Sequence, residues 1–184
     1  MKLTFKNMTL FCAFALIGAH AHLSAWSSAD EPQVRISDTG VVTTVWSVYD
    51  DANSDYVIRV NKWAAGSGWS SNATISTTPG ISFSPFIDFN ASGNGAVIWI
   101  ALDGSNVMTL FGRTYNNGSW DGGATQISHT GNDVGDYKIQ VNDNGDIVVM
   151  WQETTSTPTS DIYVMTGSSV SGGWNTSGIT KISD

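Results

Sequence analysis

Three arginines are the residues of this chain best suited to hold an acidic ligand. Arg35, Arg59 and Arg113 are its only arginines, and three guanidinium groups could bind a carboxylate through paired hydrogen bonds. They do not fall at equivalent places in the expected strands, however, because Arg35 belongs to a first strand and the other two to third strands. No Tyr/Glu nucleophile pair can be placed beside them. The favoured interpretation is surface pairing with the many aspartates.

Carboxylates are the second candidate for chemistry. They are densest at Asp50, Asp51 and Asp55, and again at Asp143 and Asp146. Two carboxylates held at the right separation could hydrolyse a glycosidic bond. All of these residues lie in expected turns, where Asp is favoured because it caps the backbone. A turn tip does not bury a carboxyl group, so it does not supply the raised pKa that a general acid needs.

Metal and cofactor motifs are weak or missing. The segment Asn142-x-Asn144-x-Asp146 is only faintly similar to a calcium loop, because its glycine falls at 145 and no bidentate Glu follows. His129 has no other histidine near it in the sequence, which argues against a zinc site. There is no Gly-x-Ser-x-Gly elbow and no phosphate-binding loop. We therefore predict no catalytic residue, no metal and no cofactor.

The elements that must position any site are repeated three times. A glycine precedes a tryptophan by six residues in each repeat, and the tryptophans are 53 and 52 residues apart. These pairs are Gly40 and Trp46, Gly93 and Trp99, and Gly145 and Trp151. A second tryptophan follows 23, 21 and 23 residues later, at Trp69, Trp120 and Trp174, and each unit then closes on Ile-Ser. A period of about 50 residues indicates an array of like modules.

The expected strands of one unit decide the architecture. Ala96–Trp99 and Ile147–Trp151 are apolar without alternation, which is typical of strands buried on both faces. One such strand in each four-stranded unit predicts small sheets packed on one another, as in the blades of a β-propeller. The predicted fold is all-β, with antiparallel blades over 30–78, 83–130 and 134–184.

The second repeat illustrates the sequence pattern of the unit. It begins with Pro85-Phe86-Ile87-Asp88-Phe89, continues with Ser92-Gly93 and an apolar run to Trp99, and ends with a turn into Trp120. This pattern resembles the blade repeats of secreted bacterial β-propeller proteins, many of which have no assigned function. The resemblance covers the whole mature chain and rests on structural positions, so it implies a fold and no catalytic motif. Ser37 to Trp46 departs from the Asp-box of sialidases, because Asp38 directly follows Ser37 and Trp46 lies too far along.

Three blades fall short of the 4–8 that a propeller ring usually contains. Two chains meeting face to face would close a six-bladed ring with two-fold symmetry, and we favour this homodimer. A fragment of a longer ring or a degraded gene is the second interpretation, and a three-bladed, sandwich-like monomer is the third.

Residues 1–21 are expected to be a secretory signal peptide. Lys2 and Lys6 give a positive start, an apolar run follows, and cleavage is expected after Ala21 or Ala25. The only cysteine, Cys12, lies within this leader. The net charge of −8 becomes more negative when the leader's lysines are lost, which disfavours nucleic acid and anionic membranes as partners. We expect a secreted or periplasmic protein with no membrane span.

The outer tryptophans carry the functional prediction. Trp69, Trp120 and Trp174 follow Gly-rich turns, so they are expected to be partly exposed, and aromatic rings in shallow clefts stack on sugars. The competing interpretation is that they cover a strand edge or seal a neighbouring blade. We predict a non-enzymatic binding module that presents repeated shallow sites for a glycan or a surface protein. The alternatives are a propeller-type glycoside hydrolase and a structural or vestigial fragment.

Overall fold

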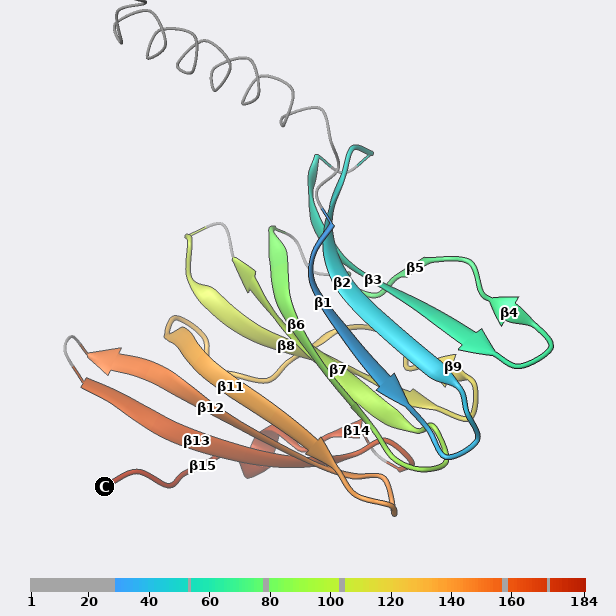
Figure 1. The fold of residues 1–184 in the computed structure, drawn as a ribbon. Coiled ribbons are helices and arrows are strands. Elements are labelled where there is room, and N and C mark those ends of the chain that lie inside the picture. The colour runs from blue at the N-terminus through green and yellow to red at the C-terminus, as the bar shows by residue number, and fades with distance from the viewer. Residues whose placement is uncertain (1–28, 53, 78–79, 103–104, 157–158, 172) are drawn as a thin grey trace, which may run out of the picture.

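The chain forms three antiparallel β-sheets that spread like a fan (Figure 1). The computed structural model describes residues 29–52, 54–77, 80–102, 105–156, 159–171 and 173–184. Blade 1 contains β1 (Ala29–Ile36), β2 (Val42–Asp50), β3 (Asp55–Ala64), β4 (Gly68–Trp69) and β5 (Ala73–Thr74). Blade 2 contains β6 (Ser82–Phe89), β7 (Gly95–Leu102), β8 (Met108–Asn116), β9 (Ser119–Trp120) and β10 (Thr125–Gln126). Blade 3 contains β11 (Asp133–Val141), β12 (Asp146–Ser156), β13 (Thr159–Ser168), β14 (Gly173–Trp174) and β15 (Thr180–Lys181), with a 3-10 turn at Thr176–Gly178.

Each blade is a four-stranded meander whose fourth strand is broken into two short pieces, both paired to the third strand. The predicted all-β fold of three antiparallel blades is confirmed, while the break was not predicted. In blade 1 the break begins at Ser70. Its hydroxyl oxygen accepts the Lys62 amide at 3.0 Å, and its own amide donates to the Lys62 carbonyl at 2.7 Å. A side chain thus takes a place that a strand carbonyl would occupy in a regular ladder.

The Ile-Ser pair that ends each repeat fastens the broken strand to its sheet. In all three blades the serine hydroxyl oxygen accepts a backbone amide of the third strand, at 2.9 to 3.1 Å. The pairs are Ser76 with Ile58, Ser128 with Leu110, and Ser183 with Ile162. The repeated motif therefore has a structural role at the outer edge of each blade.

The repeated glycines form the turn between the first and second strands. Gly40, Gly93 and Gly145 have φ values of +78°, +80° and +84°, a left-handed conformation that glycine adopts without steric cost. Each glycine amide donates to the carbonyl three residues earlier at 2.9 Å. The six-residue step then runs from this turn to the tryptophan within the second strand.

Two separate hydrophobic cores lie between the blades. Trp99 is buried between blades 1 and 2 with Val45 and Ile58. Trp151 is buried between blades 2 and 3 with Ile98. Trp99 and Trp151 therefore both face the preceding blade. Trp46 has no preceding blade among the described residues and is only half-buried.

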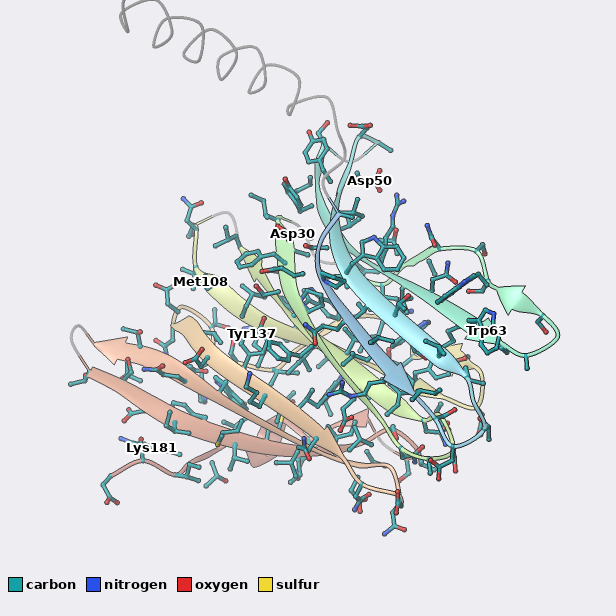
Figure 2. The ribbon with its side chains drawn as sticks, viewed as in Figure 1. Asp30, Asp50, Trp63, Met108, Tyr137 and Lys181 are labelled. Carbon is teal, nitrogen blue, oxygen red and sulfur yellow. The ribbon has the colours of Figure 1, made fainter. Side chains whose placement is uncertain are left out.

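The first strands β1, β6 and β11 lie side by side where the blades converge (Figure 1). Asp88 of β6 connects all three, because its carboxylate pairs with Arg35 of β1 at 3.1 Å and accepts the Val141 amide of β11 at 2.8 Å. Ser84 does the same, with its hydroxyl donating to Glu31 at 2.7 Å and its carbonyl accepting the Tyr137 hydroxyl. Figure 2 shows Tyr137 in this central region.

The predicted signal peptide lies outside the described residues. Within them, no helix is long and apolar enough to cross a membrane.

Candidate ligand-binding cleft

A cleft of about 430 Å³ opens between the outer parts of blades 2 and 3. One wall comes from β8, β9 and their connecting turn, and the other from the end of β13 and the turn that follows it. Its walls carry mainly hydroxyl, amide and carboxylate groups around one tryptophan. They include Thr114, Asn116, Trp120, Asp121, Val170 and Ser171.

Trp120 is held firmly at this cleft by other aromatic rings. Its ring meets that of Tyr115 edge-on, with centroids 4.9 Å apart, and that of Phe89 at 6.4 Å. These contacts place one side of Trp120 against the core between blades 1 and 2, while the residue also lines the cleft. The cleft therefore combines an aromatic ring held by its neighbours with polar wall groups.

Lys62 supports this aromatic cluster from blade 1. Its Nζ lies 3.1 Å from the centroid of the Tyr115 ring and 5.0 Å from that of Phe89, which is close enough for cation–π attraction. Burial lowers the pKa of Lys62 to about 8 and raises that of Tyr115. Blade 1 thus buttresses the rings that hold Trp120.

Asp121 has a fixed orientation in the cleft wall. One carboxylate oxygen accepts Arg113 Nε at 3.2 Å, and the other accepts the Thr114 hydroxyl at 2.9 Å and the Thr114 amide at 3.2 Å. Arg113 also donates to the Asp121 carbonyl. The paired carboxylate is therefore a preorganised hydrogen-bond acceptor.

Asn116 joins the two walls. Its amide nitrogen donates to the Val170 carbonyl at 3.2 Å, whereas its side-chain oxygen is buried and has no hydrogen-bond partner among the described residues. A buried acceptor without a partner is costly.

The three outer tryptophans lie in three different surroundings. Trp120 lines the cleft, and Trp69 is 58% exposed on the outer face of blade 1. Trp174 packs over Gly112 of blade 2, and its indole nitrogen is buried without a partner among the described residues.

The three arginines each pair with an aspartate and do not converge. Arg35 lies 3.1 Å from Asp88, Arg59 lies 3.5 Å from Asp50, and Arg113 lies 3.2 Å from Asp121. The described residues contain no group of three His, Cys, Asp or Glu side chains placed to hold a metal ion.

Glu153 is a buried carboxylate that sequence reasoning missed. Its oxygens accept Trp151 Nε1 at 2.7 Å, the His129 amide at 2.9 Å, His129 Nδ1 at 2.8 Å and Asn132 Nδ2 at 3.1 Å. Burial alone would raise its pKa, but hydrogen bonds from Trp151, His129 and Asn132 outweigh burial and lower it. An ionised, fully bonded carboxylate is poorly suited to donate a proton. Its signal in the sequence was a charge where the other repeats carry Val48 and Ala101.

Comparisons with known proteins show the fold of this chain. No protein-family model matches it, and no curated protein does. Among solved structures, it resembles the Penicillium chrysogenum alpha-L-arabinanase complexed with arabinobiose, at 11% identity and a TM-score of 0.58 over 85% of this chain and 50% of that one. It resembles the endo-arabinase from Bacteroides thetaiotaomicron at 12% identity and 0.52, over 86% and 64%. It resembles a Hadza microbial sialidase at 10% identity and 0.54, over 80% and 36%.

At such low identity the likeness shows a β-propeller fold alone. The chain spans between 36% and 64% of the length of these three proteins.

Proposed function

We propose that the protein is a secreted, non-enzymatic binding module of β-propeller type, and that the cleft at Trp120 takes a glycan. The single observation that carries this proposal is the cleft itself, where a rigid tryptophan lies beside amide, hydroxyl and carboxylate groups. A sugar ring presents an apolar face to an aromatic ring and hydroxyl groups to its rim. The Asp121 carboxylate, which lines the cleft, would accept those hydroxyls.

Resemblance to enzymes named for arabinan and sialic acid supports a glycan as the ligand class. The same resemblance also supports the competing proposal, which is that the protein hydrolyses glycosides. The fully buried carboxylate Glu153 has a lowered pKa, which favours binding over acid catalysis at that residue.

Calorimetric titration with arabinobiose, together with a glycan array, tests the binding proposal. Trp120→Ala is expected to weaken binding of the retained sugar by at least about tenfold, equivalent to about 1.4 kcal/mol. Trp69→Ala is the matched control and should leave binding unchanged, because Trp69 lies outside the cleft.

Ser171→Tyr separates loss of the site from loss of the fold. It fills the cleft from the exposed wall of blade 3 and should abolish binding while the thermal transition stays in place. Equal affinity in the unmodified protein, Trp120→Ala and Ser171→Tyr would refute the site. Hydrolysis of an aryl arabinofuranoside that stops on a single Asp or Glu substitution would favour the enzyme instead.

A further inference from the structure

The outer face of blade 1 carries exposed apolar residues together with Thr44, Asn61 and Arg59. Directly paired residues of antiparallel strands point to the same face, and pairing places Ile36, Val42, Trp63 and Trp69 in one row. Val34 and Trp46 extend this surface along β1 and β2, around a hollow of about 390 Å³. Ile36 is 68% exposed and Val34 56% exposed. We call these six residues the blade-1 face.

The outer face of blade 3, at the other end of the fan, carries apolar residues beside Lys138, Gln140 and Gln152. Met150 pairs with Val164, and Gln152 pairs with Ile162, so Met150, Ile162 and Val164 share a face. Ile182 joins them from the last segment. Met150 is 44% exposed and Ile182 54% exposed. These four residues are the blade-3 face.

Each of the two faces corresponds, by repeat position, to one side of the interfaces that join adjacent blades inside the molecule. Trp46 occupies the repeat position of Trp99 and Trp151, which are fully buried against the preceding blade. On the blade-3 face, Met150 occupies the position of Val45 and Ile98, and both of these are fully buried against the following blade.

Ile182 repeats the pattern, because its counterparts Ile75 and Ile127 are fully buried. The blade-1 face therefore carries residues at the positions that pack against a preceding blade. The blade-3 face carries residues at the positions that pack against a following blade. Each is the complement of the other.

The two faces lie at opposite ends of the fan and do not meet within one chain. Figure 2 shows Trp63 on blade 1 and Lys181 on blade 3 at its two ends. Repeated head-to-tail packing either closes a ring or grows a filament. Rings of 4–8 blades are usual, and two copies of the three described blades fall within that range.

We propose that two copies of the chain pack the blade-3 face of each on the blade-1 face of the other, closing a six-bladed ring. The turn contacts between neighbouring blades supply its register. The Asp38 amide donates to the Ala91 carbonyl at 3.2 Å, and the Asn90 side chain donates to the Asp143 carbonyl at 3.2 Å. Asp38, Ala91 and Asp143 are equivalent positions. In the ring, Asp143 of one copy therefore adjoins Asp38 of the second copy.

Engineered disulfides test this register. In a Cys12→Ser background, the double variant Asp38→Cys/Asp143→Cys is expected to run as a covalent pair of chains under non-reducing conditions. Asp38→Cys/Ala91→Cys is the matched control, because those neighbours lie in one chain and should bridge without changing the mass. A control that bridges while the test pair stays monomeric would overturn the proposal. A ladder of larger species would also overturn it, since a closed ring stops at two.

Sedimentation equilibrium tests the apolar faces independently. The unmodified protein should have the mass of two chains, and Met150→Glu should reduce it to one chain at micromolar concentration. Ile81→Glu changes a residue of similar exposure on the central blade and should remain a pair. A monomeric unmodified protein, or a Met150→Glu variant that stays paired, would refute the ring and leave the faces to another partner.

Discussion

Glycine at position 112 determines where the Trp174 ring can lie. A Cβ atom placed there would come within 2.6 Å of Trp174 Cζ2 and 2.7 Å of Ile127 Cδ1. Both atoms belong to the packed region between blades 2 and 3. The absence of a side chain at Gly112 of β8 thus leaves room for the Trp174 ring of blade 3 to pack over that strand.

Gly112→Ala is expected to destabilise the protein by about 1–3 kcal/mol, because the added methyl group overpacks a filled site. Chemical denaturation followed by tryptophan fluorescence measures the change, and the native emission spectrum of the protein should shift as the Trp174 ring is displaced.

Gly122→Ala is the matched control, since no atom lies within 4 Å of the place that a Cβ would occupy there and its φ is not in the left-handed region. Equal stability of the two variants would show that the Trp174 ring moves aside without cost.

The sequence predicted the roles of residues that recur in every blade. It did not predict the roles of residues whose surroundings differ from one blade to the next. The period predicted three antiparallel blades, because identical spacing implies identical packing. It did not predict that Trp69, Trp120 and Trp174 would have different surroundings, since these depend on which neighbouring blade is present. Nor did it predict the cleft, whose walls come from segments about fifty residues apart that only the packing of blades 2 and 3 brings together.

At the scale of elements, Glu153 ties the segment before β11 to β12. Its four hydrogen bonds come from His129, Asn132 and Trp151, so a loop and the indole of a core tryptophan are held by one carboxylate. Blades 1 and 2 carry apolar residues at this position, and blade 3 replaces packing with a buried polar network.

Glu153→Gln is expected to cost about 3 kcal/mol, because a charged acceptor is lost and donors are left poorly paired. The effect should depend on pH. The folded-state pKa of Glu153 lies below its ordinary value of 4.5, so the ionised group stabilises the fold above that pH. This contribution is lost as the pH falls through the lower folded-state value.

Thermal unfolding between pH 3 and pH 7 checks this dependence. The gap in Tm between the unmodified protein and Glu153→Gln should stay constant above about pH 5 and narrow below it. Asn132→Ala removes one donor and should cost less than Glu153→Gln. A gap that widens on acidification would contradict an ionised Glu153.

At the scale of the whole molecule, the three blades form an array in which each of the two described cores joins one pair of adjacent blades. The core around Trp99 joins blades 1 and 2, and the core around Trp151 joins blades 2 and 3. In such an array, stability is the sum of terms for each unit and each interface. Damage to one interface should therefore be felt most by the blades that share it.

Trp99→Leu and Trp151→Leu form a reciprocal pair that tests this independence. Each removes most of a fully buried indole and leaves a cavity. Hydrogen exchange should accelerate in β2 and β3 for Trp99→Leu, while β12 and β13 keep more of their protection. Trp151→Leu should give the opposite pattern. Uniform acceleration of exchange along the chain in both variants would mean that the three blades unfold as one unit. In that case the coupling of the two cores through blade 2 would be stronger than the packing of each core on blade 1 or blade 3.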